Sequence, residues 1–305
     1  MLMRYLLIII FILPICYLTI QRAKHPQLNF NSVSDHLTHP FDSRLRFKIA
    51  EVDSRFGLTQ QQVIQLSEEA IQIWHQGTGR EYFVYDPNAQ LSIRLIYDDR
   101  QENFNAMKQT EKKLTEQLQH TERDSENISS AQQNLDHLQN SIKQRRYQLD
   151  YEFEQLQKEQ NALREQHNAS TKSQQQLIQK RWRLEEQKNQ LQQDIDYFNR
   201  KSQGLNSQVH LHNKNADQLR EDAMQALRRF PPREFHKGIF MGDQIQIYQF
   251  DTEDDLRLTL AHELGHALGI EHHADPQALM YPMLEQQDLK NFRLKSADID
   301  LLNRR

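Results

Sequence analysis

The longest uniform feature of the sequence is a stretch from Gln101 to Phe230 that contains no proline and one glycine, Gly204. Gln, Asn, Glu, Lys and Arg dominate its composition. Every seventh residue is mostly apolar, in two consecutive series: Met107, Leu114, Thr121, Ile128, Leu135, Ile142, Leu149, Leu156 and Leu163, then Leu177, Leu184, Leu191, Phe198, Leu205, His212 and Leu219. Heptad spacing sustained over this length predicts a coiled coil of long helices rather than a compact domain.

A polar segment, residues 166–174, separates the two series and lacks heptad apolar residues. The arms on either side have nearly equal lengths of about 60 residues, or roughly 90 Å of helix each. This symmetry favours an antiparallel helical hairpin, which returns the chain to the point where it left a domain. One continuous helix that pairs with another chain is the alternative. Arg145, Glu152 and Lys188 interrupt the second apolar column, so we expect a narrow and locally loose seam.

The segments that flank this insertion, residues 42–100 and 231–305, have the patterns of one discontinuous globular domain. Apolar residues alternate in 44–52, 90–99 and 237–251, which predicts strands. A 3.6-residue apolar period over 58–76 predicts a helix with Thr59 as its N-cap and Gly77 at its end. Residues 251–269 form a second predicted helix, capped by Thr252 and ended by Gly269. Residues 101–230 are thus an insertion into an α+β domain.

The N-terminus carries an apolar run, Tyr5–Ile20, with basic residues on both sides. As a helix of about 24 Å it is short for a hydrocarbon core of about 30 Å. Residues 1–23 are therefore predicted to be a signal anchor or a cleaved signal peptide, followed by a polar linker, residues 24–41. Either alternative places the remaining chain outside the cytoplasm. It is then a single-pass membrane protein, or it is secreted or periplasmic after cleavage.

Charge and cysteine content restrict the function further. The formal net charge is −4, and a mildly acidic chain of this kind is not expected to bind nucleic acid. The single cysteine, Cys16, lies within the apolar run, so the chain can form neither an internal disulfide nor a cysteine metal site. Any metal ion must therefore be held by His, Asp or Glu.

The segment HELGHALGIEHH, residues 262–273, has the spacing of a metal site. Residues four apart share one face of a helix, so His262 and His266 can direct their imidazoles at one ion. Gly269 permits the chain to reverse, and His272 can then return as a third ligand. Three neutral imidazoles with one open position suit a single catalytic Zn²⁺. Glu263 is placed beside the ion, where it can act as a general base towards water.

These residues resemble the long signature of the metzincin zinc peptidases, and the following ALMYP, with Met280, resembles their methionine turn. Pro282, two residues beyond Met280, and the ending NFRLKSADIDLLNRR are similar to the matrixin branch, in which Ser296 would be an N-cap and Ile299 and Leu302 would pack inward. The resemblance implies a zinc endopeptidase with a twisted, mostly parallel five-stranded sheet, one antiparallel edge strand and long helices. By position, DQIQIYQF (243–250) would be the edge strand to which an extended peptide substrate pairs.

Several features depart from the resembled family. No cysteine is available for a cysteine switch, and a calcium requirement is doubtful because the long loops that carry calcium are missing. The coiled-coil insertion has no counterpart, and we expect it to position the enzyme, to bind a partner or to self-associate. The alternative function is a coiled-coil scaffold whose metal domain is not catalytic.

Overall fold

The computed structural model describes residues 17, 19–21, 25–165, 170–231, 236–284 and 286–304. They divide into two compact units. The first contains the described residues up to Met107 together with those from His236 onward, and the second contains Lys108–Pro231. We describe each unit by itself.

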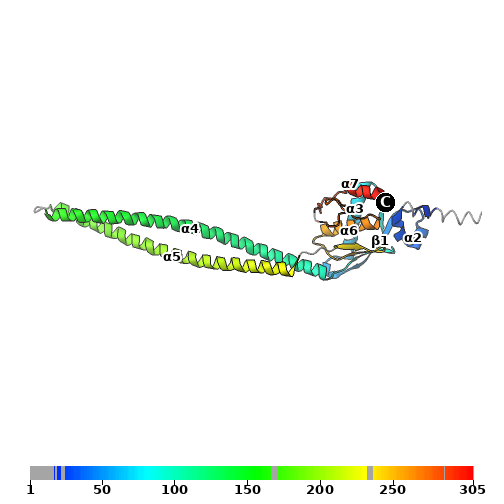
Figure 1. The fold of residues 1–305 in the computed structure, drawn as a ribbon, viewed down its shortest axis with the longest axis horizontal. Coiled ribbons are helices and arrows are strands. Elements are labelled where there is room, and N and C mark those ends of the chain that lie inside the picture. The colour runs from blue at the N-terminus through cyan, green and yellow to red at the C-terminus, as the bar shows by residue number, and fades with distance from the viewer. Residues whose placement is uncertain are drawn as a thin grey trace, which may run out of the picture. The chain divides into compact units, whose positions relative to one another are not determined.

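The first unit is built on a five-stranded sheet with the order β2-β1-β3-β5-β4, visible below its helices in Figure 1. β1, β2, β3 and β5 are parallel, and β4 is an antiparallel edge strand. The strands are β1 (Leu45–Val52), β2 (Phe83–Tyr85), β3 (Leu91–Leu95), β4 (Gly238–Phe240) and β5 (Gln244–Ile247). The mixed α+β class and the mostly parallel sheet are therefore confirmed.

The prediction that DQIQIYQF forms the edge strand is wrong. A turn at Gly242, which has a φ of +89°, divides the expected strand 237–251 into a hairpin. β5 lies inside the sheet, parallel to β3, and its residues Ile245 and Ile247 are fully buried. The shorter β4 before the turn occupies the edge instead. Positive φ favours glycine, so Gly242 is the residue that permits this turn.

Two helices, α3 (Gln60–Thr78) and α6 (Glu253–Ala267), pack against each other and the sheet (Figure 1). The predicted N-caps are confirmed, since Thr59 accepts from Gln62 N and Thr252 accepts from Asp255 N. The predicted end of α3 at Gly77 is wrong, because the helix continues to Thr78 and Gly79 takes the left-handed C-cap conformation. A Cβ on Gly77 would lie 2.6 Å from Leu294 Cδ1, so this glycine makes room for a packed side chain.

The segment predicted to be a linker, residues 24–41, is ordered in its described part. It contains a 3-10 helix, η1 (Pro26–Phe30), and a short helix, α2 (Val33–Thr38). Leu28 is 3% exposed, and the Asn31 side chain hydrogen-bonds to the backbone of β1. Its polar composition concealed this packing, which relies on few apolar residues and on side chains that bind backbone groups. A further 3-10 helix, η2 (Ser54–Phe56), and the C-terminal helix α7 (Ser296–Arg304) complete the unit.

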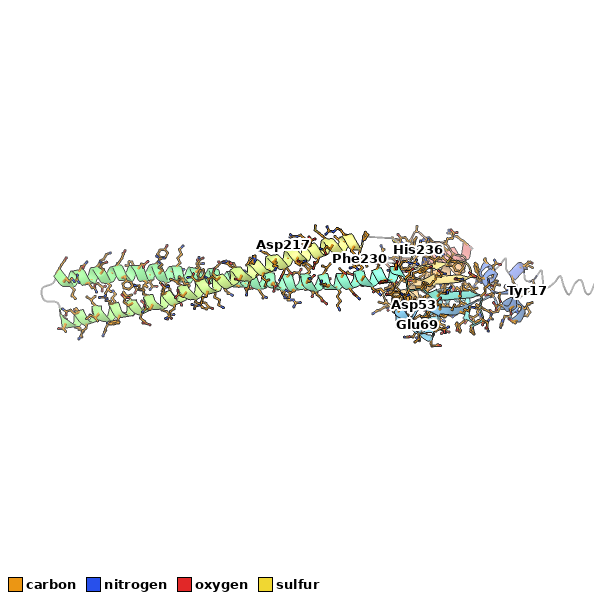
Figure 2. The ribbon with its side chains drawn as sticks, turned by 90° about the horizontal axis from the view of Figure 1, so that it is seen from below. Tyr17, Asp53, Glu69, Asp217, Phe230 and His236 are labelled. Atoms are coloured by element: carbon orange, nitrogen blue, oxygen red, sulfur yellow. The ribbon has the colours of Figure 1, made fainter. Side chains whose placement is uncertain are left out.

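The second unit consists of most of α4 (Asp99–Glu165) and of α5 (Thr171–Arg229), which run antiparallel and side by side (Figures 1 and 2). We call these two helices the arm. Buried leucines from both helices form its apolar cluster: Leu149, Leu156, Leu184 and Leu191. Side chains also pair across the seam, as in Arg145 with Asp194 and Lys180 with Glu159. A cavity of about 300 Å³ is lined partly by Arg145 and Glu152, where the heptad pattern is interrupted.

The first turn of α4 belongs to the first unit and is fixed to it. The Gln101 side chain accepts a hydrogen bond from Phe250 N at 2.9 Å and donates one to Phe250 O at 3.1 Å. Phe250 directly precedes the segment that enters α6. The helix that leaves the domain is therefore bonded to the strand end that leads into the predicted metal-binding helix.

In the part of the chain that the structure describes, no helix is long and apolar enough to cross a membrane. The predicted signal or anchor, residues 1–23, lies almost entirely outside the described residues.

Candidate metal centre

Three imidazoles meet at the C-terminal end of α6. His262 and His266 lie one turn apart, and Gly269, with a φ of +83°, reverses the chain so that His272 returns to the same place. The ring centroids are 4.9 Å apart for His262 and His266, 5.3 Å for His262 and His272, and 4.9 Å for His266 and His272. One ring nitrogen from each residue lies within 4.8 Å of the other two. The three predicted ligands are therefore brought together.

Backbone carbonyls orient two of these rings. His262 Nδ1 lies 2.7 Å from Leu279 O, and His266 Nδ1 lies 2.8 Å from Ile270 O. A carbonyl oxygen can only accept, so each Nδ1 carries the proton and donates it. The other nitrogen, Nε2, is then unprotonated and available to a cation, which is the arrangement that metal-bound histidines adopt.

The electrostatics of the site favour neutral rings. Burial lowers the pKa of His262 from its ordinary value to about 3. Burial also lowers the pKa of His266 and of His272, which is the most exposed of the three. A divalent ion needs the neutral form of imidazole, so the rings are ready to bind near pH 7 without losing a proton. The donor set fits Zn²⁺ well.

Glu263 directly follows His262 in α6 and is 4% exposed. Burial raises its pKa to about 8, although a hydrogen bond from the Phe240 backbone opposes the change. Its Oε2 is buried and has no hydrogen-bond partner. A buried carboxylate oxygen without a partner is costly, and a bound cation or a water molecule next to the imidazoles would satisfy it. Gly238 of β4 makes room for this side chain, because a Cβ there would lie 2.9 Å from Glu263 Cγ and Oε1.

Met280 lies against α6 at Gly265 and is fully buried. A Cβ on Gly265 would lie 2.8 Å from Trp74 Cζ2 and even closer to Met280 Sδ. Glycine is therefore the residue that fits this position of the helix without displacing a neighbouring side chain. The Trp74 indole N–H donates to Ala261 O at 2.9 Å, which ties α3 to the same turn.

Sequence reasoning missed Asp298, which holds the segment around Met280 in place. This carboxylate is fully buried and accepts hydrogen bonds from the backbone N–H groups of Leu279, Met280 and Lys295, each at 3.0 Å. Leu279 O in turn orients His262. An acidic residue in the first turn of a helix is also expected from the helix dipole, so the sequence offered no signal for this role.

The remaining predictions for this region have mixed outcomes. The neighbouring His273, to which the sequence assigns no ligand role, is not one of the three converging rings, and its Nδ1 accepts from Asp275 N at 2.9 Å. Leu302 packs into the core as predicted, whereas Ile299 is only partly buried. Ser296 begins α7.

Taken with the mostly parallel sheet and its antiparallel edge, this arrangement defines the metzincin class of metal-site domains. The match to one family is direct. The matrixin family, peptidase family M10, matches residues 39–304, and the chain belongs to it.

Individual relatives match a shorter region. The chain is 48% identical over 46 residues to matrix metalloproteinase-16 from rat and human, which is 15% of this chain and 8% of the relative. Rabbit macrophage metalloelastase is 49% identical over 45 residues, or 15% of this chain and 10% of the relative. Cat matrilysin is 50% identical over 38 residues, or 12% and 14%. The chain thus covers only a small part of each relative's length. No solved structure gives a significant match.

Proposed function

We propose that the chain is a zinc-dependent endopeptidase in which His262, His266 and His272 hold the ion and Glu263 is the general base. The observation that carries this proposal is the unpartnered, buried oxygen of Glu263, the residue that directly follows the first of three converging imidazoles in α6. Structural zinc sites usually fill four positions with protein ligands, whereas three imidazoles converge among the described residues. This difference favours catalysis over the alternative of a scaffold with a non-catalytic metal domain.

Each residue of the site has a distinct role in the proposed reaction. A bound Zn²⁺ supplies Lewis acidity, which activates a water molecule and polarises the scissile carbonyl group. Glu263 accepts the proton of that water and delivers it to the departing amine. The Nδ1–H bonds of His262 and His266 to backbone carbonyls keep both rings fixed during the reaction. No covalent enzyme intermediate is required.

The edge strand β4 supports a peptide as the substrate. It pairs with β5 on one side, and no other described strand covers its outer edge. An extended peptide can add to such an edge through main-chain hydrogen bonds. The contact between Gly238 and Glu263 would bring that peptide next to the base. The stretch 276–284 after the third imidazole, including Tyr281 and Pro282, would line the pocket beyond the scissile bond.

We also propose that the enzyme acts outside the cytoplasm, tethered by or released from residues 1–23, and that the arm is a coiled-coil hairpin that positions it or recruits a partner. The cross-seam pairs Arg145–Asp194 and Lys180–Glu159 share one register, which supports a hairpin within a single chain. Sedimentation of the full chain tests this, since a hairpin gives a monomer and an intermolecular coil gives an obligate dimer.

The activity is tested with purified full-length protein and an extended fluorogenic peptide. Removal of zinc by a chelator should abolish cleavage, and added zinc should restore it. Glu263→Ala should lower kcat by about 10²–10⁴-fold while the protein keeps its zinc. The matched control is Glu253→Ala, an exposed glutamate in the first turn of the same helix, which should leave cleavage unchanged. Full cleavage by Glu263→Ala would disprove the assignment of the base.

A further inference from the structure

The N-terminal strap, which we define as residues 26–38, precedes the residues that match the matrixin family. It is fastened to the start of β1 by side-chain bonds to backbone groups. Asn31 Nδ2 donates to Arg44 O at 2.9 Å, and Asn31 Oδ1 accepts from Arg46 N at 2.8 Å. Gln27 Nε2 donates to Ser43 O at 3.2 Å. These bonds occupy backbone groups around the start of β1, which is an interior strand. The strap is therefore part of the folded domain.

From this anchorage the strap reaches the edge of the sheet that borders the metal centre. The Phe30 ring meets the Phe240 ring of β4 edge to face, with centroids 5.2 Å apart and planes at 89°. Phe30 Cε1 also lies 3.9 Å from the position of a Cβ on Gly242, in the turn between β4 and β5. β4 is three residues long and is held by one neighbouring strand. A strand of this kind is weakly held unless other contacts support it.

β4 in turn contacts the proposed base. Gly238 lies against Glu263, and the Phe240 backbone hydrogen-bonds to the Glu263 carboxylate. The Phe30–Phe240 contact thus acts on the same three-residue strand that would receive the substrate and that borders the base.

We propose that Phe30 is a positioning residue, which holds β4 in the conformation that pairs with an extended substrate beside Glu263. The expected effect of Phe30 on catalysis rests on the proposed function. Its effect on the conformation of β4 rests only on the contacts described above. This positioning role differs from a role in stability alone, because a residue that acts through β4 should affect extended substrates and β4 amides selectively.

The experiment compares Phe30→Ala with Phe30→Tyr, which keeps the ring, and with Leu37→Ala. Leu37 lies in the same strap and is 73% exposed. Hydrogen exchange is followed at the amides of β4 and its turn, where Met241 N donates to Gln244 O at 2.7 Å. Kinetics are measured with an extended peptide that can span β4 and with a short peptide that cannot.

For Phe30→Ala we expect β4 amides to exchange about tenfold faster and kcat/KM for the extended peptide to fall about tenfold, mainly through KM. The short peptide, the zinc content, Phe30→Tyr and Leu37→Ala should show little change. Uniformly faster exchange throughout the domain, equal losses for both peptides, or unchanged β4 exchange would overturn the proposal. If the wild-type protein cleaves no peptide, the proposed function fails, and the exchange data still decide whether Phe30 holds β4.

Discussion

Replacing Gly265 by alanine tests how closely α6 packs over Met280 at the metal centre. The new methyl group would lie 2.8 Å from Trp74 Cζ2 and closer still to Met280 Sδ. Both neighbours are fully buried. Trp74 is also fixed by its hydrogen bond to Ala261 O, so neither side chain can move away without disturbing the core.

The magnitude follows from two opposing effects. In an unobstructed helix interior, glycine to alanine gains about 1 kcal/mol of stability. Forcing an extra methyl group into a packed core costs about 1–3 kcal/mol. Because the contacts are severe and the neighbours are fixed, the upper value applies at Gly265, and the net loss is about 2 kcal/mol. For a domain of this size, Tm falls by about 4–8 °C.

The assay uses the fluorescence of Trp74 in a Trp182→Phe background, since Trp182 is 73% exposed on the arm and would obscure the signal. Chelator is present throughout, so that zinc binding does not contribute to stability. The control is Gly204→Ala on α5, where a Cβ would meet nothing within 4 Å, and circular dichroism should show it to be stabilising. A Gly265→Ala protein that melts at or above the wild-type temperature would refute the close packing of Gly265 against Met280 and Trp74.

Three further outcomes are expected. Asp298→Asn replaces a carboxylate that accepts from three backbone N–H groups by an amide that is partly a donor. The free energy of unfolding of the chelated protein, measured by urea titration, should therefore fall by about 3 kcal/mol. An unchanged urea midpoint would contradict this role of Asp298. In the chelated protein, the pKa of His262, lowered from 6.5 to about 3, makes stability fall as pH drops below 6.5, and the lowered pKa values of His266 and His272 add to this loss. The pKa of Glu263, raised from 4.5 to about 8, makes its contribution to stability fall as pH rises from 4.5 through 8. Because the three imidazoles together outweigh the one carboxyl group below pH 6.5, thermal melts should peak near that pH. Glu263→Gln should remove the alkaline decline, and a decline that persists in this variant would assign it to another group. Leu184 is 1% exposed, so Leu184→Ala should destabilise the arm by about 2–5 kcal/mol in circular-dichroism melts. Leu211 is 57% exposed, and Leu211→Ala should leave the stability of the arm unchanged. Equal effects of the two substitutions would contradict the assigned seam.

The metal-binding region was the part best predicted from sequence, because its signals are local. A helix N-cap depends on one side chain and a backbone group three residues later, so Thr252 was found directly. Histidine spacing on a helix and the left-handed Gly269 fix where three rings must meet. The catalytic and ligand roles of these residues remain predictions that the proposed variants test.

The errors arose where the outcome depends on partners distant in sequence. Apolar alternation in residues 237–251 could not show that the shorter half would be the edge and the longer half an interior strand. Gly77 looked like a helix end, but it is needed because Leu294 packs against it. Asp298 and the strap residue Asn31 bind backbone groups, and such bonds leave no periodic pattern in a sequence.

The arm leaves the first unit after β3 and rejoins it before β4 and β5, and β3 and β5 are neighbours in the sheet. Its length is therefore free to vary independently of the chemistry. Adding or deleting one heptad in each helix would change the reach of the insertion by roughly 10 Å and alter no residue of the sheet or of α6. Evolution or an engineer could use it as an adjustable spacer in steps of seven residues.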